Sequence, residues 1–265
     1  MDILETITAY KRIEVAQQKE VAPLELLISL GSHRLNSPTL SMRQALEQSS
    51  TGIIAEFKRR SPSKGWLFPQ AKVEDIVPAY ERGGAAACSI LTDSNFFGGS
   101  FTDLQRARTM VQLPLLRKDF IVDEYQVYQS RVLGADAILL IASSLTKEVC
   151  KNLARVAHQL ELEVLLEVHT KSELSWLNEY IDMLGVNNRN LGTFHTDVEN
   201  SFRMIECMKK EAGTGDDAPL FISESGISDM KVIKELRDAG FSGFLIGETF
   251  MRTKDPGEAL REFKI

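Results

Sequence analysis

The 265-residue sequence has little of what marks secreted proteins, membrane proteins and nucleic-acid-binding proteins. Its three cysteines, Cys88, Cys150 and Cys207, lack the spacing of metal ligands or redox pairs, which favours free thiols in a reducing compartment. No apolar run approaches the roughly 20 residues that a membrane span needs, and the polar start MDILETITAYKRIEVAQQ has no signal-peptide core. The 31 Lys and Arg residues are outnumbered by 37 Asp and Glu residues, and this net charge of −6 disfavours a general nucleic-acid binder. We therefore expect a soluble cytoplasmic protein.

What the sequence does contain is a series of short apolar segments rich in Val, Ile and Leu. Most of them stay apolar until a polar residue near the carboxyl end, which is typical of parallel strands covered on both faces. The predicted strands are 52–58, 86–92, 114–120, 135–141, 163–169, 183–188, 219–225 and 243–247.

Amphipathic segments lie between these strands. They predict helices over 73–84, 123–135, 146–161 and 228–240, with Thr146 and Ser228 as N-caps. Counting after residue 50 gives about eight strand–helix units, which predicts an α/β fold of the (β/α)8 TIM-barrel type, for which ~250 residues is typical. A doubly wound open sheet is disfavoured, because no Gly-rich dinucleotide turn follows the first strand.

The first 50 or so residues fall outside this pattern. Helices are predicted over 3–18 and 41–48, joined by a mixed segment that contains Pro23 and Pro38. We interpret this region as an N-terminal helical extension packed on one end of the barrel, since a separate domain of that size is disfavoured. The expected organisation is a single barrel domain over 1–265, with the extension over 1–50 and the barrel over 51–265.

Charged and polar side chains end several of the predicted strands. They are Glu56, Lys58, Lys118, Glu167, Asn187, Arg189, Ser223 and Ser225. Strand alternation puts residues two apart on one face, and the carboxyl ends of barrel strands open into one shared mouth. Any one of these residues alone could be a solvated strand end or a satisfied ion pair. Together they predict a site for an anionic substrate with acid–base chemistry.

Two glycine-containing turns follow the last two predicted strands. Gly226 precedes a helix and Gly247 begins a short one. Loops after strands seven and eight of this fold commonly bind phosphate through backbone N–H groups, although any tight turn also favours glycine. The first loop, KRRSPSKG (58–65), adds four basic side chains, which fit either an attractor for phosphate and carboxylate or a solvated or nucleic-acid-binding loop.

Several longer motifs stand in a recognisable order and spacing. They are EFKRRSPSKG (56–65), SILTD with FFGGS (89–100), LLRKDFIVDEYQVYQSRVLGADAILLI (115–141), LLEVHT (165–170), GVNNRNL (185–191), ISESGI (222–227) and FLIGETFM (244–251). This set resembles the indole-3-glycerol phosphate synthase family, in its stand-alone form rather than its fusion with phosphoribosylanthranilate isomerase. The resemblance implies conversion of 1-(2-carboxyphenylamino)-1-deoxyribulose 5-phosphate to indole-3-glycerol phosphate, with loss of carbon dioxide and water. It implies a step of tryptophan biosynthesis that needs no metal and no organic cofactor.

The resemblance also implies catalytic roles. Lys118 is expected to be the general acid of ring closure and Glu167 the acid–base partner of dehydration. Lys58 would hold the substrate carboxylate or phosphate and supply a later proton, and the division of roles between the two lysines stays open. Glu56 would orient and balance the lysines, whose pKa values we expect neighbouring cations to lower.

The remaining candidates are expected to bind the substrate. Asn187 and Ser225 would contact its hydroxyls or carbonyl oxygen, and Arg189 would support its carboxylate end. Phe97 and Phe120 would flank the anthranilate ring, although both could also be ordinary core aromatics. The phosphate is expected to lie against Ser61, Gly226, Gly247 and the backbone N–H of Glu248. The Glu248 carboxylate should then point away from the phosphate, because like charges repel.

Other functions stay open at this point. Lys118 could form a Schiff base in a class I aldolase, and the barrel could resemble phosphoribosylanthranilate isomerase or the tryptophan synthase α subunit. A non-catalytic barrel could bind phosphate or nucleic acid through its first loop. The expected partner is a small anionic sugar phosphate with an anthranilate group, with neither nucleic acid nor membrane involved. We expect a monomer and leave weak association with other tryptophan-pathway enzymes open.

Overall fold

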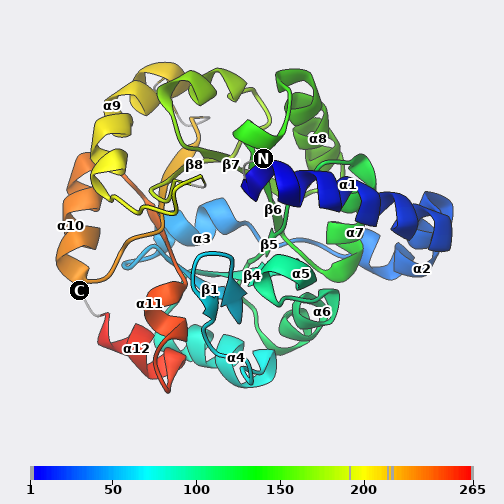
Figure 1. The fold of residues 1–265 in the computed structure, drawn as a ribbon, viewed down its shortest axis with the longest axis horizontal. Helices are drawn as coiled ribbons and strands as arrows, with labels where there is room; N and C mark the ends of the chain where they lie inside the picture. Colours follow the sequence, from blue (N-terminus) through cyan, green and yellow to red (C-terminus); the bar gives the residue numbers. More distant parts are fainter. Residues whose placement is uncertain (1–2, 191, 214, 216–217, 264–265) are drawn as a thin grey trace.

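The chain folds into a closed barrel of parallel strands (Figure 1). The computed structural model describes residues 3–190, 192–213, 215 and 218–263; Leu191, the last residue of the GVNNRNL motif, lies outside them. The barrel strands are β1 Ile53–Phe57, β4 Ala87–Leu91, β5 Leu115–Lys118, β6 Ala137–Ile141, β7 Glu163–Val168, β8 Met183–Asn187, β9 Leu220–Glu224 and β10 Gly243–Ile246. β1 pairs in parallel with both β4 and β10, which closes the barrel. The predicted strands and the TIM-barrel fold are confirmed.

Helices surround the barrel and connect its strands. They are α4 Val73–Gly83, α5 Ser94–Phe97, α6 Phe101–Met110, α7 Glu124–Leu133, α8 Lys147–Gln159, α9 Glu199–Ala212, α10 Met230–Ala239, α11 Glu248–Met251 and α12 Pro256–Glu262. The short 3-10 helices η1 Ala142–Ser144 and η2 Lys171–Trp176 follow β6 and β7. Thr146 caps α8 as predicted, but α10 is capped by Asp229 rather than Ser228, because it is the Asp229 carboxylate that accepts the Val232 N–H. Within the described residues, no helix is long and apolar enough to cross a membrane.

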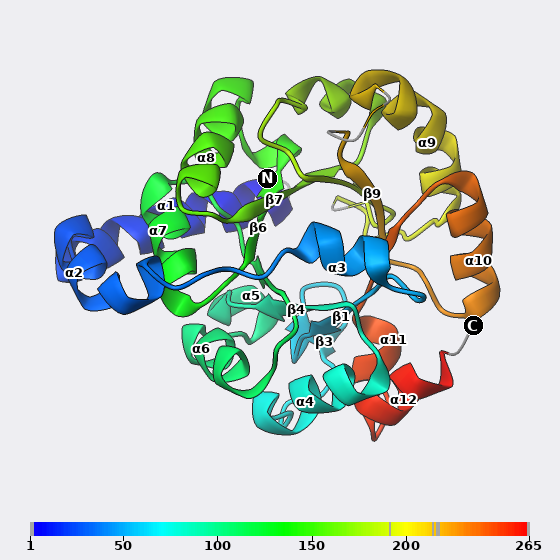
Figure 2. The same ribbon diagram turned by 180° about the vertical axis from the view of Figure 1, so that it is seen from behind.

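The N-terminal extension contacts both ends of the barrel, not the single end that the sequence suggested. Its helices are α1 Ile3–Val21, α2 Leu24–Leu35 and α3 Met42–Gln48. α1 lies over the mouth in Figure 1, whereas Figure 2 shows α3 across the opposite end. α2 packs on α7 and connects the two. The sequence missed α2 because Pro23 suggested a loop, although proline is well tolerated where a helix begins.

The barrel interior is an apolar core that the extension closes. Met42 and Leu46 of α3 join the inward side chains at the amino ends of the strands, and Leu4 and Ile7 of α1 reach the same core from the mouth. A second apolar core lies between the outer faces of the strands and the surrounding helices. The charged inward side chains at the carboxyl ends of the strands face the mouth, where the candidate site lies, whereas Glu163 at the amino end of β7 bonds α3.

Candidate active site

Two adjoining cavities open at the carboxyl ends of the barrel strands. The apolar cavity is walled mainly by carbon, from α1 and from residues such as Phe97, Phe120 and Ile141. The polar cavity is lined by the loops that follow β9 and β10. Glu56, Lys58, Arg189 and Ser225 line both cavities, so polar side chains stand where the two meet.

Lys118 lies at the centre of a cluster of charged side chains, here called the polar group, that also contains Glu56, Lys58, Glu167 and Glu224. Its Nζ lies 3.2 Å from Glu167 Oε2 and 3.4 Å from Glu224 Oε2, at the end of β5. Burial alone would lower the pKa of Lys118, but the carboxylates of Glu167, Glu224 and Glu56 outweigh it and raise that pKa above its ordinary value. The expectation that nearby cations lower this pKa is therefore wrong: the neighbours of Lys118 are carboxylates, and they keep its ammonium charged.

Lys58 and Glu56 form a second buried ion pair beside the first. Lys58 Nζ lies 2.5 Å from Glu56 Oε1. Burial alone would raise the pKa of Glu56, but Lys58 and Lys118 hold it below its ordinary value. Gly247 makes room for this carboxylate, since a Cβ at that position would lie 2.4 Å from Glu56 Oε1. Glu56 thus contacts Lys58 directly, and its predicted role in orienting and balancing both lysines stays a prediction.

Glu224 is a site residue that the sequence analysis missed. Strand alternation was counted from Ser223 and Ser225, but the inward residues of β9 are Ile222 and Glu224. A Cβ on Gly185 would lie 2.3 Å from Glu224 Oε1, so the glycine of the neighbouring strand admits this side chain. Burial first, and then the nearby carboxylates Glu167 and Glu56, raise the pKa of Glu224 above its ordinary value. The site therefore contains a carboxyl group that can hold a proton near neutral pH.

The two serines of β9 have different roles. The Ser223 hydroxyl faces outward, 2.8 Å from the Ser201 hydroxyl of α9 and within reach of the Asn188 amide. Ser225 follows the strand with a left-handed backbone (φ 69°), a conformation that costs a non-glycine residue energy and clusters at functional sites. This conformation ends the strand alternation and brings Ser225 to the walls of both cavities. The prediction that Ser223 also faces the mouth is wrong, because Ser223 lies on the outward face of the strand.

Glu167 is held from several sides. Lys118 approaches one carboxylate oxygen, the Asn187 side chain hydrogen-bonds to the carboxylate, and His169 Nε2 lies 3.4 Å from Oε1. Burial alone would raise the pKa of Glu167, but Lys118 and His169 hold it below its ordinary value. Glu167 is therefore an ionised carboxylate that can accept a proton.

The apolar cavity has the predicted aromatic walls and an unpredicted roof. The rings of Phe97 and Phe120 lie 6.0 Å apart, centroid to centroid. Ile3, Leu4 and Ile7 of α1 complete the cavity from above. Ser61 also lines this cavity rather than the polar one, and its hydroxyl accepts the Lys64 N–H. The predicted contact of Ser61 with phosphate stays a prediction.

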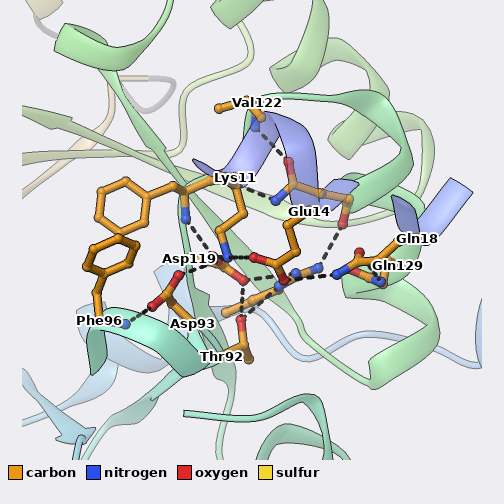
Figure 3. Close-up of polar contacts among 12 residues, drawn as sticks. Lys11, Glu14, Gln18, Thr92, Asp93, Phe96, Asp119, Val122 and Gln129 are labelled. Atoms are coloured by element: carbon orange, nitrogen blue, oxygen red, sulfur yellow. Dashed lines mark hydrogen bonds and ion pairs between the residues drawn. The ribbon is translucent and has the colours of Figure 1, made fainter. Parts of the chain in front are cut away.

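A buried lysine fastens α1 to the mouth (Figure 3). Lys11 Nζ lies 2.9 Å from Glu14, 3.0 Å from Asp93 and 3.0 Å from Asp119, and the residue is only 1% exposed. Asp119 also binds Arg117 at 3.0 Å. Burial alone would raise the pKa of Asp119, but Arg117 and Lys11 hold it at about 2. Sequence patterns do not indicate this cluster, because Asp93 and Asp119 lie about 80 and 110 residues after Lys11 along the chain.

The polar cavity contains the glycines of both predicted turns. Gly226 and Gly247 line it together with Lys64 and Glu248. The Glu248 carboxylate is neutralised by Arg189 at 2.8 Å and Arg252 at 3.0 Å. Arg189 also donates to Ser63 Oγ at 3.2 Å, so it connects the first loop to the loop after β10.

Two arginines of the first loop have structural contacts instead of facing the mouth. Arg59 forms a bidentate pair with Asp103 of α6, and Arg60 donates to the Asn95 carbonyl. The loop contains the hairpin strands β2 Arg60–Ser61 and β3 Gly65–Trp66, which the sequence analysis missed. Of the four basic side chains predicted to attract the substrate, Lys58 and Lys64 line the apolar or the polar cavity, whereas Arg59 and Arg60 line neither.

No group of three or more His, Cys, Asp or Glu side chains suited to a metal ion occurs within residues 3–190, 192–213, 215 and 218–263.

The sequence profile described as "Indole-3-glycerol phosphate synthase" matches residues 4–263. The chain belongs to the indole-3-glycerol phosphate synthase family. Family members named indole-3-glycerol phosphate synthase include one from Bacteroides thetaiotaomicron, 55% identical over 262 residues, covering 99% of this chain and 97% of the relative. Another, from Carboxydothermus hydrogenoformans, is 41% identical over 266 residues, with 97% of each chain covered.

Solved structures agree on the fold of this family member. A tryptophan synthase alpha-subunit variant from Pyrococcus furiosus aligns with a TM-score of 0.61 and 12% identity, covering 81% of this chain and 96% of that one. The tryptophan synthase alpha subunit from Legionella pneumophila gives a TM-score of 0.60 at 12% identity, covering 84% and 94%. At these identities the likeness shows the barrel alone.

Proposed function

We propose that this indole-3-glycerol phosphate synthase closes the indole ring at Lys118, with the carboxylates of Glu167 and Glu224 as its proton partners. The observation that carries the proposal is the position of the Lys118 ammonium, 3.2 Å from one carboxylate and 3.4 Å from the other at the edge of an aromatic-walled cavity. A buried ammonium group held among carboxylates can donate protons and stabilise developing negative charge.

The two cavities suit the two ends of 1-(2-carboxyphenylamino)-1-deoxyribulose 5-phosphate. The anthranilate ring would lie between Phe97 and Phe120, where burial of apolar surface favours binding. The phosphate would lie in the polar cavity against Gly226, Gly247 and the N–H of Glu248, with Lys64 nearby. The ribulose would span the junction, where Lys58 lines both cavities.

Ring closure joins the ring carbon that bears the carboxylate to the ribulose carbonyl carbon. Lys118 would protonate the carbonyl oxygen as the bond forms, because the developing alkoxide is far more basic than an amine. Loss of carbon dioxide then restores the aromatic ring. Asn187 and Ser225 would hold the substrate hydroxyls, and Arg189 would support the carboxylate until it leaves.

Dehydration needs a proton on the departing hydroxyl and a base for the adjacent carbon. Glu167, whose pKa lies below its ordinary value, would be the base. The acid would be Lys58 or Glu224: the Lys58 side chain pairs with Glu56 at the junction of the cavities, and the pKa of Glu224 lies above its ordinary value. We also propose that the protein works in the cytoplasm on this small molecule and that it is a monomer. Sedimentation of the purified protein would test the oligomeric state.

The direct experiment mixes purified, chelator-treated protein with the substrate and follows indole fluorescence. Lys118→Met should lower kcat by at least about 10²-fold, the usual contribution of a positioned acid. Lys151→Met is the matched control, since Lys151 forms an exposed pair with Glu179 at 2.8 Å on the outside of the barrel. Near wild-type turnover by Lys118→Met, or no product from the wild type, would contradict the proposal.

A further inference from the structure

The proposed reaction consumes a proton from solvent in every cycle. One proton goes to the carbonyl oxygen at ring closure and a second goes to the departing hydroxyl, while only one is removed from carbon. The carboxylate leaves as neutral carbon dioxide, so the product carries one negative charge fewer than the substrate. The buried acid–base group must therefore be resupplied with one proton before the next turnover.

A line of titratable side chains leads from Lys118 away from the cavities. Lys118 Nζ faces Glu167 Oε2 at 3.2 Å, and the other oxygen, Oε1, lies 3.4 Å from His169 Nε2. The opposite ring nitrogen, His169 Nδ1, lies 3.6 Å from Glu173 Oε2. Each step therefore uses a different atom of the shared residue, which is the arrangement that a proton relay needs.

The exposed fractions of these side chains indicate which end of the line lies closer to solvent. The Glu167 side chain is 2% exposed, whereas those of His169 and Glu173 are each 14% exposed. Glu173 lies on η2, outside both cavities, and its Oε2 accepts the His169 backbone N–H at 2.6 Å. Within the described residues, the two His169 ring nitrogens face the carboxylate oxygens of Glu167 and Glu173, and no other hydrogen-bond partner competes for them.

The charges around His169 allow it to hold a proton. Glu167 of β7, Glu173 of η2 and Glu224 of β9 face it as carboxyl groups, Lys118 of β5 lies beyond Glu167, and Asn200 of α9 donates only to its carbonyl oxygen. Burial alone would lower the pKa of His169, but Glu173 and Glu167 outweigh it and raise that pKa above its ordinary value.

We propose that His169 and Glu173 form the proton-entry relay that resupplies Glu167 and Lys118 after each turnover. Glu173 takes a proton from water and passes it to His169 Nδ1, while His169 releases the proton on Nε2 to Glu167 Oε1. Reorientation of the imidazole ring restores the starting tautomer. The relay rests on the proposed function, and His169 acts only through Glu167, without touching substrate.

The test separates the first turnover from later ones by rapid mixing. His169→Asn should form the first equivalent of product at the wild-type rate and then turn over at least about tenfold more slowly above pH 7, giving a burst. The steady-state rate should fall further as pH rises, and added imidazole should restore it in His169→Ala. Glu173→Gln, whose side chain can still accept the His169 N–H, should give the same burst and covers the case in which the histidine variants fail to fold.

The matched control is His158→Asn. His158 pairs with Asp182 at 3.0 Å, at the opposite end of the barrel from the mouth, and should give no burst. Equal slowing of first and later turnovers in the His169 and Glu173 variants, without imidazole rescue, would overturn the relay and leave a structural role. No product from the wild type would instead overturn the proposed function, and the relay with it.

Discussion

Replacing Lys11 by Met tests whether the buried ion cluster fastens the N-terminal helix to the barrel. The substitution keeps the apolar stem and removes the cation that faces Glu14, Asp93 and Asp119. Asp119 keeps Arg117, but within the described residues Asp93 Oδ2 has no polar partner besides the Lys11 ammonium. Removing one partner of a buried ion pair costs about 3–5 kcal/mol.

For a domain near this size, each kcal/mol lowers Tm by about 2–4 °C, so the expected loss is about 6–20 °C. Thermal melts followed by circular dichroism measure it. Lys19→Met is the control, because Lys19 joins the same helix to Asp123 at 2.7 Å with side chains 45% and 34% exposed. An exposed pair of this kind contributes about 0–1 kcal/mol. Equal Tm shifts in the two variants would show that the buried cluster holds α1 no more strongly than the exposed pair does, and would refute the reasoning.

The same variant should affect substrate binding more than chemistry. Ile3, Leu4 and Ile7 form the roof of the apolar cavity only while α1 stays docked. Lys11→Met should therefore raise KM several-fold with a smaller change in kcat, and hydrogen exchange in α1 should speed up while the barrel strands stay protected. Unchanged exchange in α1 together with an unchanged KM would show that the roof does not depend on Lys11.

Three further predictions follow from the site. Gly226→Asp should raise KM, since a Cβ there would meet Thr196 at 2.7 Å and a carboxylate would repel phosphate; steady-state kinetics at saturating substrate should show the smaller effect on kcat. Glu224→Gln should become more stable relative to wild type as pH rises from 5 to 8 in urea melts. Because the pKa of this carboxyl group is raised in the folded protein, the unfolding free energy of wild type falls as pH rises above the unfolded pKa of about 4.3. A difference in unfolding free energy between the two proteins that stays constant with pH would contradict the raised pKa. The stability advantage of wild type over Asp119→Asn should persist above pH 4 and shrink as pH falls toward 2, because the folded pKa is about 2 and the unfolded one about 3.9.

Much of the fold could be predicted from the sequence because parallel strands that are buried on both faces have nearly continuous apolar sequences. The predicted strands fall within about two residues of the observed ones. Lys118 and Glu167 could be predicted as neighbours for the same reason. Each follows an inward apolar residue by two positions, so strand alternation alone sends both into the mouth.

The remaining features depend on contacts between distant segments. The inward face of β9 was misjudged because the left-handed backbone of Ser225 ends the alternation after Glu224. Arg59 looked like a substrate ligand because its partner, Asp103, is 44 residues away. Lys11 of α1 meets Asp93 and Asp119 at the mouth, and amphipathic periodicity shows which face of a helix is buried without showing what covers it.

The residues of the polar group come from strands spread around the whole barrel. Lys58 and Lys118 belong to the first half of the chain with Glu56, whereas Glu167 and Glu224 belong to the second half. Lys118 of the first half therefore finds both of its ion-pair partners, Glu167 and Glu224, in the second half. Their electrostatic attraction favours the union of the two halves over either half in isolation. The side chains proposed for catalysis thus also help to make the barrel a single cooperative unit.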